Sequence, residues 1–332
     1  MKNLILPEIS LGTIGTGKIV HSILDGAART EGIHCTAVYS RSEAKGKALA
    51  KAYGVNTVYT DLSDLMTDPR VNLIYIASPN DLHYSQTKMA LEHGKNVLCE
   101  KPLTPDKVQA EELVRLADEK SLLLLDAVPT LYLPNFQILK ENLPRIGRVR
   151  LALSNFSQYS SRYNNLLAGE MPNVFSLSHA GGCLQDINFY NIYLNVALFG
   201  EPCEAVYYPN RKPGQADTSG VVVLRYNDFV SSCAGAKDTW GDNYVLIEGE
   251  QGYIRVKDGS AGLVEIRVVT RTSDETFNRQ SDPDRWFYEI QEITRLMRAG
   301  ECDVFEKNMA ITVATLGIME KARKAAGIYF EE

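Results

Sequence analysis

The sequence contains no apolar run long enough to cross a membrane. Its apolar runs, such as Leu122 to Leu125, have the length of a β-strand, whereas a membrane-spanning helix needs about 20 residues. The first residues, Met1 to Leu4, also lack the apolar segment and cleavage site of a signal peptide. We therefore expect a cytoplasmic protein without a membrane partner.

Positive charge and paired cysteines are also scarce. The chain has 35 Lys and Arg against 41 Asp and Glu, a net charge of −6, which disfavours nucleic acid as the main partner. The six cysteines stand far apart without a C-x-x-C pair, so we expect reduced, mostly buried thiols. No cluster has the spacing of zinc ligands, and we expect no metal.

The 332 residues exceed what one hydrophobic core usually serves, so two domains are expected. In the first third, strand-like segments alternate with helix-like segments, which is typical of a doubly wound parallel sheet. The expected strands are Ile9–Ile14, His34–Tyr39, Leu73–Ala77, Asn96–Cys99 and Leu122–Asp126. The expected helices are Lys18–Thr30, one capped by Ser42 that runs to Tyr53, Leu82–His93, and one opened by Thr104 and Pro105 that runs to Lys120. We predict a Rossmann domain over residues 1–126.

After Asp126 the pattern changes to strands without intervening helices, which favours an antiparallel or mixed sheet. We predict a C-terminal α+β domain over residues 127–332, with an open sheet. Its expected strands are Val149–Tyr159, Ala205–Tyr208, Val221–Tyr226, Val230–Ala236, Tyr244–Glu248, Tyr253–Val256 and Val264–Val269. Its expected helices are Pro134–Glu141, Leu184–Phe199, Asp284–Ala299 and about 308–326.

A glycine-rich turn joins the first strand to the first helix. Gly15 and Gly17 fit the first two positions of G-x-G-x-x-G, and Val20 replaces the third glycine. One glycine permits a tight turn, the next lets the backbone approach a pyrophosphate, and the helix N-terminus offers N–H groups to the anion. The position of this motif predicts a dinucleotide site, although an ordinary glycine-rich turn would look similar.

The end of the second strand bears on the choice between NAD and NADP. An NAD site usually has Asp or Glu there to bind the ribose 2′-hydroxyl, but this chain reads Tyr39-Ser40-Arg41-Ser42. Arg41 can pair with a 2′-phosphate, and Ser40 and Ser42 can donate to it. We therefore expect NADP in preference to NAD, the alternative being a solvated arginine that starts a helix.

A charged pair follows the fourth of these strands, within Cys99-Glu100-Lys101-Pro102-Leu103. This stretch resembles the Glu-Lys-Pro signature of the glucose–fructose oxidoreductase / inositol 2-dehydrogenase (Gfo/Idh/MocA) family. The glycine motif, Ala77-Ser78-Pro79-Asn80 with His83, and Gly181-Gly182-Cys183-Leu184-Gln185-Asp186 agree in order and spacing. The resemblance covers nearly the whole chain. It implies a Rossmann domain followed by an open mixed sheet, through which members often form homodimers or homotetramers.

The resemblance also implies roles for individual residues. The pyrophosphate loop would be held by Gly12, Ile14, Gly15, Thr16, Gly17, Lys18 and Ile19. Ser78, Asn80 and His83 would lie along the cofactor, and Glu100 and Lys101 near the nicotinamide ribose and substrate. Asp186 and Tyr190 would enter the substrate pocket from one helix, since residues four apart share a helical face.

Two positions depart from the family pattern. Many members have a histidine four residues after the aspartate, where this chain has Tyr190, which resembles the dimeric trans-dihydrodiol dehydrogenases. Relatives often have an arginine where this chain has Leu131, so a sugar substrate does not follow directly. His83 is better explained as a structural or cofactor-packing residue than as a catalytic one, and His179 as a loop residue.

The expected reaction is hydride transfer between the nicotinamide and a hydroxyl or carbonyl of a sugar, polyol, inositol or dihydrodiol. Tyr190 would exchange the proton, Lys101 would stabilise tyrosinate or alkoxide, and Asp186 would orient the substrate or Lys101. Tyr190 can instead be a core aromatic residue. Two other functions stay open, a non-catalytic cofactor-binding regulator and an NAD-dependent glycoside hydrolase, and the presence of Lys101 disfavours the regulator.

Overall fold

The structure is a computed structural model that describes residues 5–212 and 214–331, so Met1 to Leu4 lie outside the described residues. Its contacts divide the chain into two compact units. The first unit comprises the residues up to Thr104, Val108–Tyr132 and Asp284–Ala310. The second comprises Pro105–Lys107, Leu133–Pro283 and the residues from Ile311 onward. The units are thus discontinuous in sequence, and the division at residues 126 and 127 into two functional domains stays a prediction.

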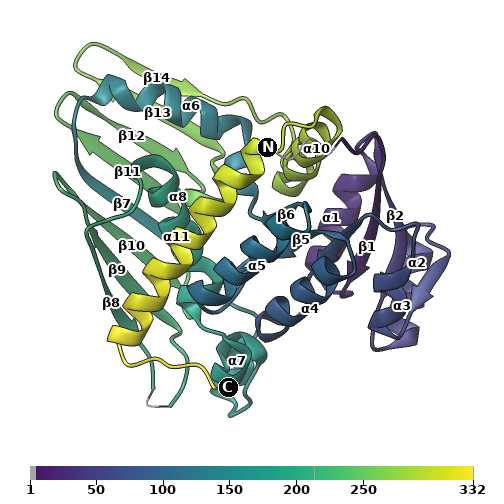
Figure 1. The fold of residues 1–332 in the computed structure, drawn as a ribbon. Helices are drawn as coiled ribbons and strands as arrows, with labels where there is room; N and C mark the ends of the chain where they lie inside the picture. Colours follow the sequence, from purple (N-terminus) through teal and green to yellow (C-terminus); the bar gives the residue numbers. More distant parts are fainter. Residues whose placement is uncertain (1–4, 213, 332) are drawn as a thin grey trace. The chain divides into compact units, whose positions relative to one another are not determined.

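The first unit contains a six-stranded parallel sheet in the order β3-β2-β1-β4-β5-β6, which confirms the predicted doubly wound fold. Figure 1 labels β1, β2, β5 and β6 of this sheet. The strands are β1 Ile9–Ile14, β2 Ile33–Tyr39, β3 Thr57–Tyr59, β4 Leu73–Ile76, β5 Asn96–Glu100 and β6 Leu124–Ala127. The helices between them are α1 Lys18–Ala28, α2 Glu43–Ala52, α3 Leu62–Thr67, α4 Asn80–Glu92 and α5 Lys107–Glu119. The short β3 and α3 were not among the expected elements.

Helix boundaries follow local capping where a cap lies close in sequence. Ser42 accepts the Lys45 N–H at the start of α2, as predicted, and Gly54 follows the end of this helix with φ +68°. The expected start of α5 was wrong, because the helix begins at Lys107 and not after Thr104. The Lys107 N–H donates to the Glu320 carboxylate (2.9 Å), so a residue remote in sequence satisfies it.

A distant helix completes the first unit. Helix α10, Arg285–Ala299, starts where the Asp284 carboxylate accepts the Trp286 N–H (3.1 Å). It packs on α1 so closely that a Cβ at Gly26 would lie 3.3 Å from the Trp286 carbonyl oxygen. Its apolar face shares one core with α1 and the sheet, through residues that include Ile23, Leu24, Ile290, Ile293, Leu296 and Met297.

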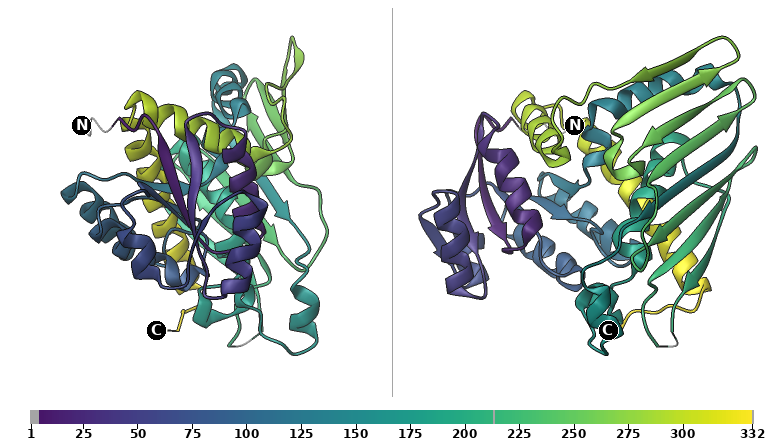
Figure 2. Two further views of the ribbon diagram at one scale, coloured as in Figure 1. Left: turned by 90° about the vertical axis from the view of Figure 1, so that its right-hand side faces the viewer. Right: turned by 180° about the vertical axis from the view of Figure 1, so that it is seen from behind.

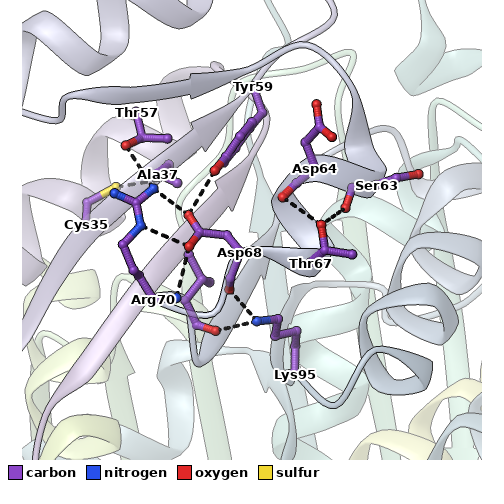
Figure 3. Close-up of polar contacts among 11 residues, drawn as sticks. Cys35, Ala37, Thr57, Tyr59, Ser63, Asp64, Thr67, Asp68, Arg70 and Lys95 are labelled. Atoms are coloured by element: carbon purple, nitrogen blue, oxygen red, sulfur yellow. Dashed lines mark hydrogen bonds and ion pairs between the residues drawn. The ribbon is translucent and has the colours of Figure 1, made fainter.

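A polar cluster around Asp68 ties together the loop between α3 and β4 (Figure 3). The Asp68 carboxylate accepts from the Arg70 guanidinium (2.7 and 3.0 Å) and from the Tyr59 hydroxyl (3.1 Å). The buried Lys95 ammonium donates to the carbonyl oxygens of Asp68 (2.6 Å) and Val71 (2.8 Å). The cluster thereby joins β3, the start of β4 and the residue that precedes β5. The hydrogen bonds from Arg70 lower the pKa of Asp68 to about 2.

The second unit is built on an eight-stranded mixed sheet in the order β14-β13-β12-β11-β7-β10-β9-β8, in which only β7 and β10 pair in parallel. Helices α6 Pro134–Asn142 and α8 Phe189–Phe199, with the part of α11 (Asp303–Ala325) from Ile311 onward, lie along one face of this sheet (Figure 2). The unit also contains two short α-helices, α7 Tyr163–Leu167 and α9 Gly259–Gly262, and the 3-10 turns Leu143–Ile146, Asn173–Phe175 and Leu177–His179. The strands are β7 Val149–Ser157, β8 Glu204–Asn210, β9 Ser219–Arg225, β10 Val230–Ala236, β11 Tyr244–Gly249, β12 Gly252–Lys257, β13 Glu265–Thr270 and β14 Asp274–Phe277.

The predicted helix Leu184–Phe199 forms, but its first turn is not α-helical. Leu184–Asn188 is a π-helical turn, and α8 continues from Phe189. In a π-turn the backbone hydrogen bonds join residues five apart and not four apart, and such turns are frequent at functional sites. The α-helical spacing therefore does not by itself place Asp186 and Tyr190 on one face.

All six cysteines are free thiols, and four of them are buried, which agrees with the expected reduced state. Among the described residues, no helix has both the length and the apolar character needed to span a bilayer.

We predict that Asp68→Asn lowers the free energy of unfolding by about 2 kcal/mol at pH 7, since the Asp68 pKa lies nearly two units below 3.8. A depressed carboxyl pKa contributes stability above the unfolded pKa and loses it as the pH falls. The difference between the two proteins should therefore shrink between pH 4 and pH 2. Urea unfolding at pH 7, 4 and 3 measures it, with Asp64→Asn on the exposed face of α3 as the control. Equal losses at pH 7 and pH 3 would contradict the prediction.

Candidate functional site

The parallel register brings four loops of the first unit to one edge of the sheet. Ile14 at the end of β1 pairs with Tyr39 of β2 and Ile76 of β4, and Ile76 pairs with Cys99 of β5. The segments that follow these strands, residues 15–17, 40–42, 77–80 and 101–102, therefore share the carboxyl edge. The strand order reverses between β1 and β4, which is where doubly wound sheets bind their ligands.

The glycine turn has the geometry that an anion site requires. Gly15 has φ +118°, and a Cβ there would lie 2.7 Å from the Ala77 carbonyl oxygen, so only glycine fits. Gly17 is the N-cap of α1 and has no side chain with which to cap this end of the helix. A Cβ at Gly17 would meet nothing within 4 Å among the described residues. The turn thus presents backbone N–H groups to an open space, which fits a pyrophosphate.

The other predicted loop residues have different surroundings. Thr16, Lys18 and Ile19 lie in the turn or the first helical turn and are partly or fully exposed. Gly12 and Ile14 lie within β1 and are buried. A Cβ at Gly12 would come within 2.9 Å of the Leu65 and Val71 side chains, so this glycine serves core packing. Their contact with a cofactor stays a prediction.

The loop after β2 places a cation near the glycine turn. The Gly15 N–H donates to the Tyr39 carbonyl (3.3 Å), so the two loops are directly joined. Ser40 is buried, and its hydroxyl accepts the Ser42 N–H (3.2 Å). Arg41 is exposed, and within the described part of the chain no hydrogen bond or ion pair holds its guanidinium.

Glu100 anchors the Glu-Lys-Pro turn at the end of β5. Its carboxylate accepts the Tyr75 hydroxyl (2.7 Å), and both residues are buried. Burial raises the pKa of Glu100. Glu100 is therefore held against the sheet, whereas the next residue, Lys101, is partly exposed.

His83 joins the turn after β4 to the turn after β5. Its Nδ1 lies 2.8 Å from the Pro102 carbonyl oxygen, and its Nε2 lies 2.9 Å from the Ser78 carbonyl oxygen. The ring is buried, and this burial lowers its pKa. Both ring nitrogens are thus engaged by the protein, which favours the structural interpretation of His83. Ser78 and Asn80 are partly exposed beside it, and the Ser78 hydroxyl donates to the Gln86 side chain (2.7 Å).

In the second unit, the π-turn carries an ion pair that the sequence did not predict. The Lys237 ammonium, directly after β10, contacts the Asp186 carboxylate. Gly181 and Gly182 precede this turn. The backbone at Gly182 packs closely against Asp217, since a Cβ there would lie 2.3 Å from an Asp217 carboxylate oxygen. Asp217 in turn accepts the Leu184 N–H (2.7 Å) and so holds the start of the π-turn.

Tyr190 lies in the first turn of α8 and is 5% exposed. Its ring is 5.8 Å from the Phe156 ring of β7 and contacts the Phe189 ring edge-on. These contacts are equally suited to a packing aromatic and to a phenol that is shielded from water, so its catalytic role stays a prediction.

Lys237 and Glu289 are among the buried charged residues that were missed at the sequence level. Lys237 lies 51 residues from Asp186, and no local pattern links them. Glu289 lies on the apolar face of α10, one turn before Ile293. This position within the apolar helical pattern could have indicated from the sequence that Glu289 is buried. Neither carboxyl oxygen of Glu289 has a hydrogen-bond partner among the described residues. Burial, together with Glu100 and Asp126 nearby, raises its pKa well above the ordinary value.

A parallel sheet in this order, with a helix N-terminus behind a glycine turn at its carboxyl edge, is the architecture of a dinucleotide-binding Rossmann domain. Residues 9–126 match the family described as "Oxidoreductase family, NAD-binding Rossmann fold" (GFO_IDH_MocA). The chain is 34% identical to scyllo-inositol 2-dehydrogenase (NADP(+)) IolU of Bacillus subtilis, over 97% of this chain and 98% of that protein. It is 31% identical to the oxidoreductase YgjR of Escherichia coli, over 97% and 98%.

The chain therefore belongs to the Gfo/Idh/MocA oxidoreductase family, as the motifs predicted. It is 24% identical to trans-1,2-dihydrobenzene-1,2-diol dehydrogenase of Sus scrofa, over 89% of this chain and 90% of that protein. Among solved structures, a 3-ketoreductase from Actinomadura kijaniata with NADP and TDP-benzene shares the fold, with a TM-score of 0.84, 22% identity and coverage of 96% and 97%. Levoglucosan dehydrogenase does so with a TM-score of 0.83 and 18% identity, over 96% of this chain and 98% of that one.

These findings support one of the three functions that the sequence left open. The chain is an NAD(P)-dependent oxidoreductase that acts on CH–OH groups by hydride transfer. The relatives named above include dehydrogenases, an oxidoreductase and a ketoreductase, and none is named as a regulator or a glycoside hydrolase.

We predict that Gly17→Ala and Gly15→Ala separate cofactor binding from folding. Gly17→Ala should cost less than about 1 kcal/mol of stability, because its methyl group meets open space, yet weaken NADP binding at least about tenfold by blocking the pyrophosphate. Gly15→Ala should cost about 1–3 kcal/mol of stability, because of its positive φ and the Ala77 carbonyl. Calorimetric titration and thermal unfolding measure the two effects. Wild-type NADP affinity in Gly17→Ala would place the pyrophosphate elsewhere.

Proposed function

We propose that this chain is an NADP-dependent dehydrogenase of a neutral cyclic polyol or sugar, with Lys101, Tyr190 and Asp186 as its reacting and orienting residues. The observation that carries the proposal is the carboxyl edge of the first sheet. There the uncapped N-terminus of α1, exposed Arg41 and partly exposed Lys101 follow neighbouring strands in register.

The preference for NADP rests on charge. The loop after β2 has no acid to accept a ribose 2′-hydroxyl, and it presents the Arg41 guanidinium with no protein partner among the described residues. A guanidinium binds a phosphate in two-point fashion, which adds affinity and orientation. The name of the Bacillus subtilis relative specifies NADP(+), which supports the same choice.

The chemistry needs a proton carrier and a cation at the reacting oxygen. When bound, the nicotinamide accepts or donates the hydride. Tyr190 exchanges the proton of the substrate oxygen, and a phenol with a reference pKa of about 10 needs a nearby cation to act near neutral pH. Lys101 supplies that positive charge and stabilises the oxygen as it becomes negative. Asp186 accepts a hydrogen bond from the substrate and orients it.

The substrate class follows from the relatives and from the second unit. The relatives are named for scyllo-inositol, for a dihydrodiol and for levoglucosan, which are all neutral, cyclic and rich in hydroxyl groups. In this chain, the Asp186 carboxylate is paired with Lys237, so the two charges balance. A neutral substrate suits such a site better than an anionic one.

The oligomeric state and cellular location expected from the sequence also belong to this proposal. The edge strand β8 exposes Val206 and Tyr208, which supports assembly into a homodimer or homotetramer through the second sheet. Light scattering of the purified protein tests the assembly, and a monomer at all concentrations would overturn it. Fractionation of cells tests the cytoplasmic location.

The proposed activity is tested by following NADPH absorbance with scyllo-inositol, levoglucosan and other cyclic polyols. We predict that Tyr190→Phe lowers kcat by about 10²- to 10⁴-fold, the range for loss of a general acid or base. Lys101→Met should also abolish turnover but leave NADP binding intact, and the double variant should be no slower than the slower single one.

Tyr193→Phe is the matched control, because it removes a hydroxyl from the same helix, α8. It should keep kcat within about threefold, well inside the acid–base range. A fall of less than about fivefold in Tyr190→Phe would reduce Tyr190 to a packing residue.

We predict that Arg41→Ala weakens NADP binding by about 1.5–3 kcal/mol, the range for hydrogen bonds to charged groups. NAD binding should barely change, because NAD has no 2′-phosphate. Calorimetric titration of both cofactors measures this, with Lys51→Ala at the far end of α2 as the control. Equal weakening of NADP and NAD binding would mean that Arg41 does not bind the 2′-phosphate.

A further inference from the structure

The ion pair between Lys237 and Asp186 is asymmetric in its exposure. The Lys237 side chain is 7% exposed, whereas the Asp186 side chain is 30% exposed. A molecule in solution can therefore reach the carboxylate but not the ammonium behind it. Lys237 can act on such a molecule only through Asp186.

The backbone holds Lys237 in place on both sides. Its N–H donates to the Thr218 carbonyl (2.8 Å), and its carbonyl accepts the Ser160 N–H (2.8 Å). These bonds tie the residue to the start of β9 and to the segment after β7. These bonds thus fix the backbone position from which the Lys237 side chain extends.

Two further carboxylates belong to Asp217, which precedes Thr218, and Asp238, which follows Lys237, but each has its own donors. Asp217 accepts the Tyr207 hydroxyl (2.6 Å) and the Leu184 N–H (2.7 Å). Asp238 accepts the hydroxyls of Thr218 (2.6 Å) and Ser219 (3.0 Å). The lysine instead pairs with Asp186, the carboxylate at the π-turn.

We propose that Lys237 is a positioning residue that fixes Asp186 as an anion, so that its carboxylate accepts a hydrogen bond from the substrate hydroxyl next to the reacting carbon. This inference rests on the proposed polyol dehydrogenase activity and specifies its substrate class. The substrate is a vicinal diol, with one hydroxyl that reacts and a neighbouring hydroxyl that donates to Asp186.

The physical reason is the chemistry of a paired carboxylate. An ionised carboxylate only accepts hydrogen bonds, so it distinguishes a hydroxyl from an ether of similar shape. A fixed cation beside it keeps it ionised and in one orientation. A site built to bind a substrate hydroxyl discriminates strongly against an analogue without it, because its own polar group is then left unpaired.

The test compares trans-cyclohexane-1,2-diol with its monomethyl ether, 2-methoxycyclohexanol, at saturating NADP. The ether keeps one oxidisable hydroxyl and the neighbouring oxygen but cannot donate to Asp186. Wild type should prefer the diol in kcat/KM by at least about tenfold, as expected for one hydrogen bond to a charged group. Lys237→Met should narrow this preference to within about threefold, mainly through a higher KM for the diol.

Matched variants separate positioning from general damage. Lys237→Arg should restore most of the preference, and Arg225→Met, which breaks an exposed ion pair with Glu204 in the same sheet, should leave it unchanged. Asp186→Asn should lose the preference, and the double variant Asp186→Asn with Lys237→Met should match Asp186→Asn. This double variant leaves no uncompensated charge, so it carries the test if Lys237→Met alone does not fold.

The outcomes are distinct. A collapsed preference in Lys237→Met with rescue by Lys237→Arg supports the inference. Equal losses on diol and ether, or an unchanged preference, overturn the inference but leave the dehydrogenase proposal standing. If wild type oxidises neither these alcohols nor any polyol of the wider panel, the proposed function fails and the inference fails with it.

Discussion

The steric contact between Gly15 and the Ala77 carbonyl is the constraint on which the candidate site depends. It lets the turn after β1 lie directly against the end of β4 and so brings the N-terminus of α1 to the carboxyl edge of the sheet. Gly15 also donates to the Tyr39 carbonyl, so the same residue joins the turn to the end of β2. These two contacts and the strand register set the positions of the loops that carry Arg41 and Lys101 relative to the N-terminus of α1.

The order of the elements in the fold could be predicted from the sequence because it rests on local patterns. The alternation of apolar strands with helices, and the Ser42 cap, need only neighbouring residues. The errors occurred where a distant residue decides the outcome. Helix α5 begins at Lys107, not after Thr104, and its first N–H donates to the distant Glu320. The short strand β3 carries too few residues to show a period.

The candidate site was predictable to the same extent. Motifs contiguous in sequence, such as the glycine turn and the Glu-Lys-Pro turn, identified the carboxyl edge correctly. Properties that depend on burial did not follow from the motifs. Glu100 and His83 stand next to partly exposed residues in sequence, yet their side chains are buried and bonded within the protein. The partner of Asp186 could not be predicted from the sequence, because only the pairing of distant strands brings Lys237 to the π-turn.

The discontinuity of the two units has a consequence for how the protein is made. The core of the first sheet includes Ile290, Ile293 and Phe305, so it lacks part of its apolar cover until the ribosome has passed these codons. The second unit in turn waits for the residues from Ile311 onward. Both units therefore complete their packing in the last stage of translation, and a prematurely terminated chain leaves both apolar cores open to chaperones and proteases.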